Sequence, residues 1–476
     1  MRRSLIAVPP QLTAVLLGAG SLLILAFAPA QYLGRQQDDL MYLLAAKALP
    51  TGRYELITAV GHPPLTSTAP GWPLLMAPLG FLTDAPGIFQ AFAALLLAAG
   101  PWLLWAWLRR RTENATALLA ALILASSPLL LSQSGTLMPE AAYLIVFLAA
   151  LMASESDRRA IAGGLGALLV LVRPAGLSAL PALAAEPALK RRWADVARAL
   201  TPALIAAAVW SAWSMKRSGG VQEAGELALA YGGGASMSPF HVMLSNARFF
   251  SASLGGCFLP PLHADGTGAV LLGAVLLLTV SLGIARALRR KTSDPAASAL
   301  LGAVAMHALW TWQYERYLIP LLPLLLWAMI EGLGAAAPRV LAALLAAQLG
   351  FQTLPRLGRP SPWAEPELSR TYAWLQSHPA PGALASALPV RDGWYAQRPC
   401  LPLPDAEDAA DFAAKLKGAR ARFILRQDGL DIGLSAGKSA PLQRLLDRAY
   451  GQLDDAKRFR KIHEEPAERA SVYEPL

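Results

Sequence analysis

The most constraining feature of this sequence is a succession of apolar runs separated by short loops rich in basic residues. The clearest run extends from Gly87 to Leu108 and is followed at once by Arg109, Arg110 and Arg111. A membrane-spanning helix needs about 20 predominantly apolar residues. Only 16% of the 476 residues are charged, whereas soluble domains carry about 25%. The sequence therefore predicts a polytopic α-helical membrane protein.

Basic residues in the short loops predict the orientation of the helices, because Lys and Arg are retained on the cytoplasmic side of a membrane. Arg2 and Arg3 precede the first run, Leu12–Ala30, which ends without a convincing small-residue cleavage site. We interpret it as an uncleaved first helix that runs outward. The net charge of +10 is explained by these loops. No basic patch is interleaved with aromatic residues, so nucleic-acid binding is not expected.

The alternation of apolar runs and basic loops predicts about 11 transmembrane helices within residues 1–355, with the C-terminus outside the cytoplasm. Trp72–Leu82 is expected to be a short re-entrant or partly buried piece and Ser214–Thr267 a long polar loop. The expected spans are Leu12–Ala30, Gly87–Leu108, Leu118–Leu131, Ala141–Ala153, two short helices within Ile161–Ala185, Ala199–Trp213, Gly268–Ala285, Ala297–Trp310, Leu318–Leu333 and Val340–Phe351.

The composition changes near Arg356, beyond which charged residues and prolines are common and no spanning run occurs. Residues 356–476 are therefore predicted to form a small extracytoplasmic α/β domain, long enough to fold alone. The expected helices are Pro366–Ser377, Ala406–Lys417 and Leu442–Ala449, and the expected strands are Ala383–Pro389 and Arg422–Arg426.

The first external loop, residues 31–73, contains the adjacent carboxylates Asp38 and Asp39 at the start of a predicted helix. Adjacent residues on a helix do not share a face, so one acid can point into a cavity while the other holds a neighbour. A partly buried carboxylate could accept a proton from a hydroxyl group. The simpler alternative is that both acids only stabilise the helix N-terminus.

A third carboxylate, Glu140, lies where the chain re-enters the membrane from the same side, directly after Pro139. Acids from two loops on one face could share a metal ion or a substrate. The alternative is again a residue that only begins a helix.

Two arginines, Arg173 and Arg316, lie at outer turns of apolar hairpins. An arginine within an apolar segment is costly unless it faces water or a partner, and a guanidinium binds phosphate oxygens as a bidentate fork. Both arginines are therefore candidates for binding a phosphate, with Tyr317 beside the second one. The structural alternative is that they bind carbonyls of a broken helix, or that Arg316 pairs with Glu315.

Other chemistry-bearing residues give weaker signals. Tyr54 and His62 lie in the first loop near the acids, where a single histidine is more often solvated than catalytic. Cys257 and Cys400 are too few for a disulfide scaffold or a zinc ribbon; unpaired thiols are favoured over a bridge, which stays open. No histidine has a partner at metal-ligand spacing, and no Gly-rich phosphate loop occurs.

Taken in order, these residues resemble the GT-C fold glycosyltransferases, polytopic enzymes that use polyprenyl-phosphate sugars and include the lipid A aminoarabinose transferases, the protein O-mannosyltransferases and their bacterial relatives. The resemblance covers the membrane portion. It rests on Asp38-Asp39-Leu40-Met41-Tyr42, Ala46, Gly52, Tyr54, Pro63-Pro64, Pro70-Gly71-Trp72-Pro73, Glu140, Arg173-Pro174, Arg316-Tyr317-Leu318-Ile319-Pro320 and Pro323.

The resemblance implies a hexosyl- or pentosyltransferase of the inner (plasma) membrane. It implies a polyprenyl-phosphate sugar as donor and a lipid, glycan or protein as acceptor. The transfer would take place outside the cytoplasm, and membrane lipids would surround the protein. Asp38 would be the base that takes the acceptor's proton, and inversion at the anomeric carbon would follow from a single displacement. Arg316 and Arg173 would stabilise the phosphate leaving group. Tyr42, Tyr54 and His62 are further first-loop candidates.

The sequence departs from the family pattern in places. Asp39 stands where relatives often have Glu, and His62 is nearest to a family lysine that has no clear match. The resemblance leaves a divalent metal ion open, with Asp38, Asp39 or Glu140 as its ligands. The alternatives to an enzyme are a transporter or flippase of a lipid-linked molecule, or a membrane scaffold. Transporters usually contain inverted repeats, and we find no internal repeat.

Overall fold

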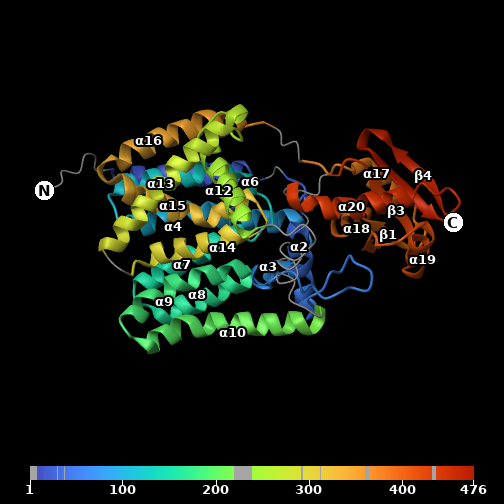
Figure 1. Ribbon diagram of the computed structural model, residues 1–476, viewed down its shortest axis with the longest axis horizontal. Helices are drawn as coiled ribbons and strands as arrows, with labels where there is room; N and C mark the ends of the chain where they lie inside the picture. The colour runs from blue at the N-terminus through green and yellow to red at the C-terminus, as the bar shows by residue number, and fades with distance from the viewer. Residues whose placement is uncertain are drawn as a thin grey trace. The chain divides into compact units, whose positions relative to one another are not determined.

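The computed structural model describes residues 8–28, 31–36, 38–218, 238–290, 293–310, 312–359, 364–430 and 436–476 (Figure 1). The chain divides into two compact units. The first unit comprises Met1–Ala30, Thr66–Leu75 and Ala85–Pro360. The second comprises Gln31–Leu65, Met76–Asp84 and Ser361–Leu476.

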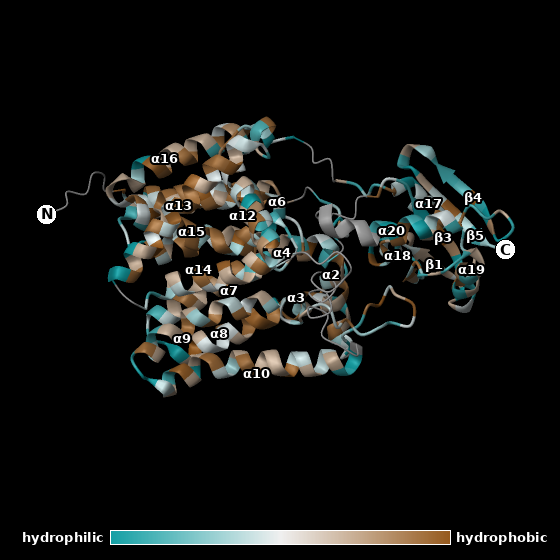
Figure 2. Cartoon of the chain, viewed as in Figure 1, coloured by the Kyte–Doolittle hydropathy of each residue, from teal (hydrophilic) through white to brown (hydrophobic). Residues whose placement is uncertain are grey.

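The first unit is built from helices, most of them predominantly hydrophobic (Figure 2). Their bounds are α1 (Pro10–Ala26), α3 (Gly71–Gly80, shared with the second unit), α4 (Pro86–Leu108), α5 (Asn114–Ser126), α6 (Pro128–Gln133), α7 (Glu140–Glu155), α8 (Arg159–Val172), α9 (Leu180–Leu189), α10 (Trp193–Ser218), α12 (Pro239–Gly256), α13 (Thr267–Arg290), α14 (Pro295–Leu309), α15 (Leu322–Leu333) and α16 (Ala337–Gln348).

Within the described residues, 4 helical segments are long and apolar enough to cross a membrane. They are Pro86–Leu108, Trp193–Arg217, Thr267–Arg290 and Glu315–Arg356. The shorter apolar helices are Pro10–Ala26, Asn114–Ser126, Arg159–Val172 and Pro295–Leu309. The count of about 11 transmembrane helices stays a prediction.

The expectation of a polar loop over Ser214–Thr267 is wrong for its second half, which contains the helix α12. Residues 219–237 lie outside the described part of the chain. Helix α12 packs against α13 at small residues: a Cβ added to Gly255 would lie 2.0 Å from the carbonyl oxygen of Ala269. Such glycines let two helix backbones approach closely in a membrane protein.

Helix α12 also carries a buried polar residue, Asn246. The Asn246 amide donates hydrogen bonds to the carbonyl oxygens of His307 and Trp310, each at 2.8 Å. These carbonyls lie at the C-terminal end of α14, where helical carbonyls have no intrahelical partner. The partner of this polar side chain is remote in the sequence, so local composition could not identify it.

The predicted interruption of Ile161–Ala185 at Arg173-Pro174 is confirmed. Helix α8 ends at Val172, and Arg173 is extended, with φ −153° and ψ 141°. A short 3₁₀ segment, η2 (Pro174–Ala179), leads into α9. The cause is local, because a proline disfavours helical backbone angles in the residue before it.

The second unit contains a 5-stranded sheet in the order β2-β1-β3-β5-β4. The strands β2, β1 and β3 are parallel, whereas β5 pairs antiparallel with both β3 and β4. Their bounds are β1 (Ala383–Ser386), β2 (Cys400–Pro402), β3 (Ala421–Gln427), β4 (Phe459–Glu465) and β5 (Ala470–Pro475).

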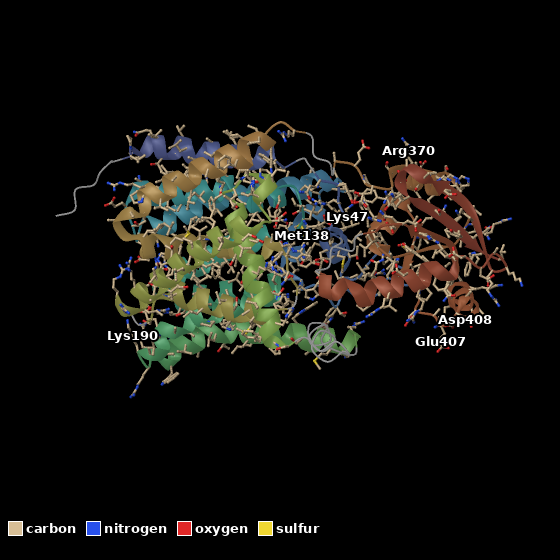
Figure 3. All side chains as sticks on the ribbon, turned by 45° about the horizontal axis from the view of Figure 1, so that its top comes forward. Lys47, Met138, Lys190, Arg370, Glu407 and Asp408 are labelled. Atoms are coloured by element: carbon tan, nitrogen blue, oxygen red, sulfur yellow. The ribbon has the colours of Figure 1, made fainter. Side chains whose placement is uncertain are left out.

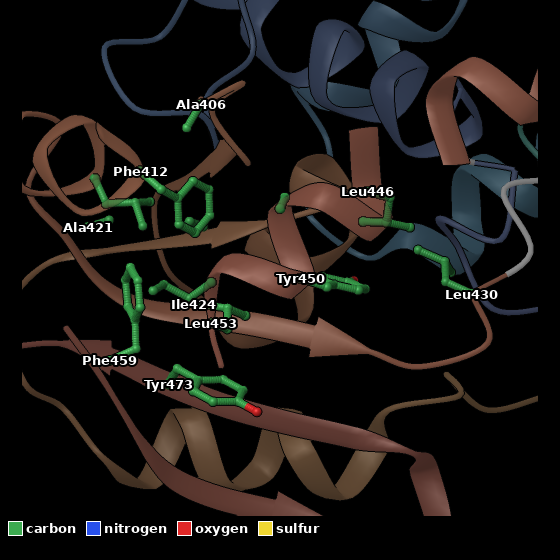
Figure 4. Packing of buried hydrophobic residues seen from close by; sticks show 13 residues of the cluster. Ala406, Phe412, Ala421, Ile424, Leu430, Leu446, Tyr450, Leu453, Phe459 and Tyr473 are labelled. Carbon is green, nitrogen blue, oxygen red and sulfur yellow. The ribbon is translucent and has the colours of Figure 1, made fainter. Parts of the chain in front are cut away.

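Helices cover both faces of this sheet. On one face, Phe412 of α19 (Ala409–Gly418) and Tyr450 of α20 (Ala436–Gln452) pack in a cluster with Ile424 of β3 (Figure 4). On the other face, Leu375 of α17 (Ser369–Ser377) packs in a second cluster, which includes Ala396 at the end of α18 (Pro389–Ala396). The α/β character expected of this region is therefore confirmed.

Several elements of this unit were missed by the sequence prediction, namely α18, β2, β4 and β5. Strand β2 has only 3 residues, too few to show an alternating pattern. Strand β4 is an edge strand with the sequence FRKIHEE. Charged side chains suit an edge, because they oppose pairing with another chain, but they hide the strand from a hydrophobicity pattern.

The second unit also includes most of the first loop. Its helix α2 (Asp38–Ala48) carries the acidic pair. Farther along, Thr58 and Val60 flank a parallel bridge to the edge strand β2: Cys400 donates its amide to Thr58 O at 2.9 Å, and Val60 donates to Cys400 O at 3.1 Å. Residues far apart in the sequence thus belong to one folded unit.

Candidate active site

Glu140, Arg173 and Arg316 form a charged group in the first unit, which we call the Arg–Glu–Arg cluster. Glu140 is the first residue of α7 and is fully buried, with 0% of its surface exposed. Arg173 Nη1 donates a hydrogen bond to Glu140 Oε1. Arg316, in the 3₁₀ segment η4 (Glu315–Leu321), places Nε 3.7 Å from the same oxygen.

The cluster contains one carboxylate and two guanidinium groups, and both guanidinium groups approach the same carboxylate oxygen. A fully buried carboxylate must be paired to remain charged at low cost, which explains why both arginines approach it. Glu140 Oε2 has no hydrogen-bond partner among the described residues. Two guanidinium groups that converge on one carboxylate present donors of the kind that bind the oxygens of an anion such as phosphate.

Each of the two guanidinium groups lies over the ring of a tyrosine. Arg173 Cζ lies 4.8 Å from the ring centroid of Tyr317, and Arg316 Cζ lies 4.5 Å from that of Tyr314. Arg316 Nη1 also contacts Met138 Sδ at 3.8 Å (Met138 is labelled in Figure 3). Stacking on aromatic faces limits the rotamers of an arginine and so prepares it for a planar ligand.

A cavity of about 350 Å³ opens beside the cluster. Arg173 and Tyr317 line it together with Pro174, Leu177 and Trp310. The polar groups Ser67, Tyr143, Ser178 and His307 also face it. A mostly apolar wall with a few convergent polar groups is typical of a small-molecule site.

The acidic pair lies in the second unit, where the two carboxylates have different surroundings. Asp39 is 1% exposed, and its Oδ1 accepts hydrogen bonds from the amides of Gly34 at 2.9 Å and Leu40 at 2.7 Å. Asp38, the first residue of α2, is only half-buried. Asp39 is thus committed to holding the turn before α2, while Asp38 keeps access to solvent.

The remaining first-loop candidates lie farther along the second unit. Burial raises the pKa of Tyr54 well above its ordinary value, and the nearby Tyr42 raises it further. His62 has a positive φ of 45° and lies beside Glu55, with Nδ1 3.5 Å from Oε1. This pairing gives His62 a local structural partner.

The structure thus brings four predicted residues together, Glu140, Arg173, Arg316 and Tyr317. Sequence reasoning missed Tyr314 and His307, although the spacing of Tyr314 and Arg316 was a usable signal. Among the residues that the structure describes, no group of three or more His, Cys, Asp or Glu could hold a metal ion. Cys257 and Cys400 are both buried free thiols.

Comparison with known proteins gives a match in structure only. No protein-family model matches the chain, and no curated protein matches its sequence. The oligosaccharyltransferase of Archaeoglobus fulgidus in the apo form matches with a TM-score of 0.54 and 13% identity, over 88% of this chain and 70% of that one. The same enzyme tethered with an acceptor peptide containing the NVT sequon also has a TM-score of 0.54, at 14% identity, over 88% and 69%.

ArnT from Cupriavidus metallidurans, bound to undecaprenyl phosphate, matches over 98% of both chains with a TM-score of 0.50 and 11% identity. At such identities a likeness establishes the fold. The chain is a polytopic membrane protein. Its fold is the GT-C fold that the sequence resembles, and this expectation is confirmed.

Proposed function

We propose that the chain is an integral membrane glycosyltransferase. It transfers a sugar from a polyprenyl-phosphate donor to a lipid, glycan or protein acceptor outside the cytoplasm. The observation that carries this proposal is the Arg–Glu–Arg cluster, with its two guanidinium groups, beside a largely apolar cavity of about 350 Å³. A lipid-linked phosphate has both features that such a site selects, an anionic head and an apolar chain.

In this proposal the donor phosphate binds to Arg173 and Arg316. Pro174, Leu177 and Trp310 contact the isoprenoid chain. The undecaprenyl phosphate bound to ArnT, a protein with the same fold, supports this choice of donor. We assign Glu140 the role of holding the two guanidinium groups, because both approach its one oxygen.

Transfer then proceeds as a single displacement. The acceptor's hydroxyl or amine attacks the anomeric carbon, and the bond from that carbon to the phosphate oxygen breaks. The acceptor's proton goes to the carboxylate of Asp38, and the electron pair goes to the phosphate, whose charge the two arginines stabilise. Attack from the face opposite the phosphate inverts the anomeric centre. The half-buried position of Asp38 suits a proton acceptor better than the buried, hydrogen-bonded position of Asp39.

The test assays the purified protein for transfer from a panel of polyprenyl-phosphate sugars. Asp38→Asn should lower kcat by about 10²-fold or more. The matched control is Asp405→Asn, which changes a 70% exposed acid in the same unit and should leave kcat unchanged. A chelator added to the same assay decides whether a divalent ion takes part.

Two outcomes would overturn the proposal. Equal turnover by the wild type and Asp38→Asn removes Asp38 as the base. Movement of the intact donor across a vesicle membrane, with no sugar released from its phosphate in any combination, indicates a flippase or transporter instead. A reporter fused after Leu476 tests the side of the C-terminus, and activity in the cytoplasm would contradict the extracytoplasmic placement.

A further inference from the structure

Helix α18 of the C-terminal sheet region contacts the last turn of α2, the helix that begins with the acidic pair, and also the turn that precedes α2. At one end, Tyr395 Oη donates a hydrogen bond to the carbonyl oxygen of Leu33 at 2.8 Å. At the other end, Nζ of Lys47, in the last turn of α2, lies 5.4 Å from the ring centroid of Trp394 (Lys47 is labelled in Figure 3). Two consecutive residues of α18 therefore contact the turn before α2 and the end of α2.

The contact at the start of α2 leads directly to the acids. Gly34, the residue after Leu33, donates its amide to Asp39 Oδ1 at 2.9 Å. Leu40 donates to the same oxygen at 2.7 Å. The orientation of Asp39, and with it the backbone of its neighbour Asp38, depends on the placement of residues 33 and 34.

Gly34 is itself tightly enclosed. Its φ of +90° is accessible chiefly to glycine, and a Cβ added there would lie 2.9 Å from Cγ of Arg391. Arg391 cannot move aside easily, because Nε donates to Asp392 Oδ1 at 2.8 Å and Nη2 donates to Gln427 Oε1 at 2.9 Å. Gln427 is the last residue of β3, so the turn rests on the sheet.

Tyr395 is fixed as firmly as Arg391. Its ring stacks on that of Tyr372, with the centroids 5.4 Å apart. Tyr372 in turn donates its hydroxyl to Asp392 Oδ1 at 2.6 Å. Burial raises the pKa of Tyr395, and the charge of Asp39 raises it further. The phenol therefore stays protonated, as a donor must be, throughout the neutral range.

We propose that Tyr395 is a positioning residue of the transferase, which holds the Leu33 carbonyl and thereby sets the turn that orients Asp39 and the backbone of Asp38. The α/β domain of the C-terminal region thus contributes to catalysis without touching substrate. The expected effect on sugar transfer rests on the proposed function. The role of Tyr395 in holding the turn can be tested separately, by a measurement that needs no enzymatic activity.

The kinetic test is Tyr395→Phe, which removes one hydroxyl and keeps the ring stack. We expect kcat to fall about tenfold or more with KM for the donor unchanged, because misplacement of a catalytic group lowers the rate steeply while the donor-binding arginines are not altered. The matched control is Tyr450→Phe. Its hydroxyl accepts the amide of Gln427 at 3.1 Å in the same unit, and within the described part of the chain it makes no hydrogen bond to the first loop.

The second readout is amide hydrogen exchange of peptides covering residues 31–42 in the full-length protein. Tyr395→Phe should speed exchange at Gly34 and Leu40, whereas Tyr450→Phe should not. Unchanged exchange in Tyr395→Phe overturns the positioning role. Equal losses of kcat in the two variants at equal thermal stability would also overturn it. If no transfer occurs even in the wild type, the proposed function fails, and the exchange result still decides whether Tyr395 holds the turn.

Discussion

Arg173 donates a hydrogen bond to the fully buried carboxylate of Glu140, 33 residues earlier in the chain. The same oxygen attracts Arg316, which comes from a third segment. The carboxylate therefore determines where two positive charges lie. It thereby orients two guanidinium groups, whose N–H donors suit the oxygens of a phosphate.

The first prediction concerns the charge of Glu140. Glu140→Gln keeps the shape of the side chain but removes the negative charge that two partly buried guanidinium groups approach. The free energy of unfolding should fall by about 3–5 kcal/mol, which thermal unfolding in detergent would measure. Glu113→Gln, at an exposed position of the same unit, is the control and should have little effect.

The double variant Glu140→Gln/Arg173→Gln sharpens this test. It removes one negative and one positive charge together, so the summed charge at the cluster is the same as in the wild type. It should therefore be more stable than Glu140→Gln alone. A double variant that is less stable than the single one would contradict the charge argument.

The second prediction concerns the geometry of Arg316. Arg316→Lys keeps the charge but loses the planar fork and the stacking on Tyr314, 4.5 Å away. We expect kcat to fall by roughly 10²-fold, the scale for losing a donor to a developing oxyanion. Steady-state transfer kinetics would measure it. Arg289→Lys, at an exposed position near the end of α13, should behave as the wild type does, and a fall there of the same size would point to a general charge effect.

The third prediction separates backbone strain from a steric clash. Gly52 and Gly34 both have positive φ, at 75° and 90°. An added Cβ meets nothing within 4 Å at Gly52, but at Gly34 it lies 2.9 Å from Arg391. Gly52→Ala should cost about 1 kcal/mol of unfolding free energy from strain alone, and Gly34→Ala clearly more. Chemical denaturation of the second unit would measure both, and equal costs would show that Arg391 yields to the new methyl group.

The fourth prediction concerns alkaline pH. Burial, together with a smaller contribution from the charge of Asp392, raises the pKa of the Cys400 thiol from 9.0 to about 12. The unfolded chain therefore ionises first. This contribution to stability is fully present below about pH 9 and is lost as the pH rises through about 12.

Each pH unit within that window should lower the free energy of unfolding by up to about 1.4 kcal/mol for this one group. A pH series of unfolding measurements would test it. Cys400→Ser removes the titrating thiol and should flatten the curve just above pH 9. Parallel curves for the two proteins would contradict the assignment.

Local patterns predicted more of the helical unit than of the α/β unit. The break at Arg173 follows from the proline after it, and α4 follows from an apolar run that ends at three arginines. In contrast, α12 was missed because the composition of its stretch predicts a polar loop rich in glycine, and its buried Asn246 finds its partners only at the end of α14. The strand β4 was missed because the charged side chains of an edge strand hide it from a hydrophobicity pattern.

The candidate site divides in the same way. The residue types and their order indicated Asp38, Asp39, Glu140, Arg173 and Arg316 as polar groups placed at the ends of apolar runs. The sequence could not show which of them pair. Whether Glu140 holds a metal or an arginine depends on contacts between segments that lie far apart in the chain.

By itself, the sequence determined the class of the molecule, because apolar length and the placement of basic residues are local properties that a bilayer selects. Only the tertiary structure decided that Glu140 joins two arginines and that the turn before Asp38 rests on Tyr395 of the C-terminal region. Those contacts form between residues that are remote in sequence, and their free energy exists only when the intervening chain has folded.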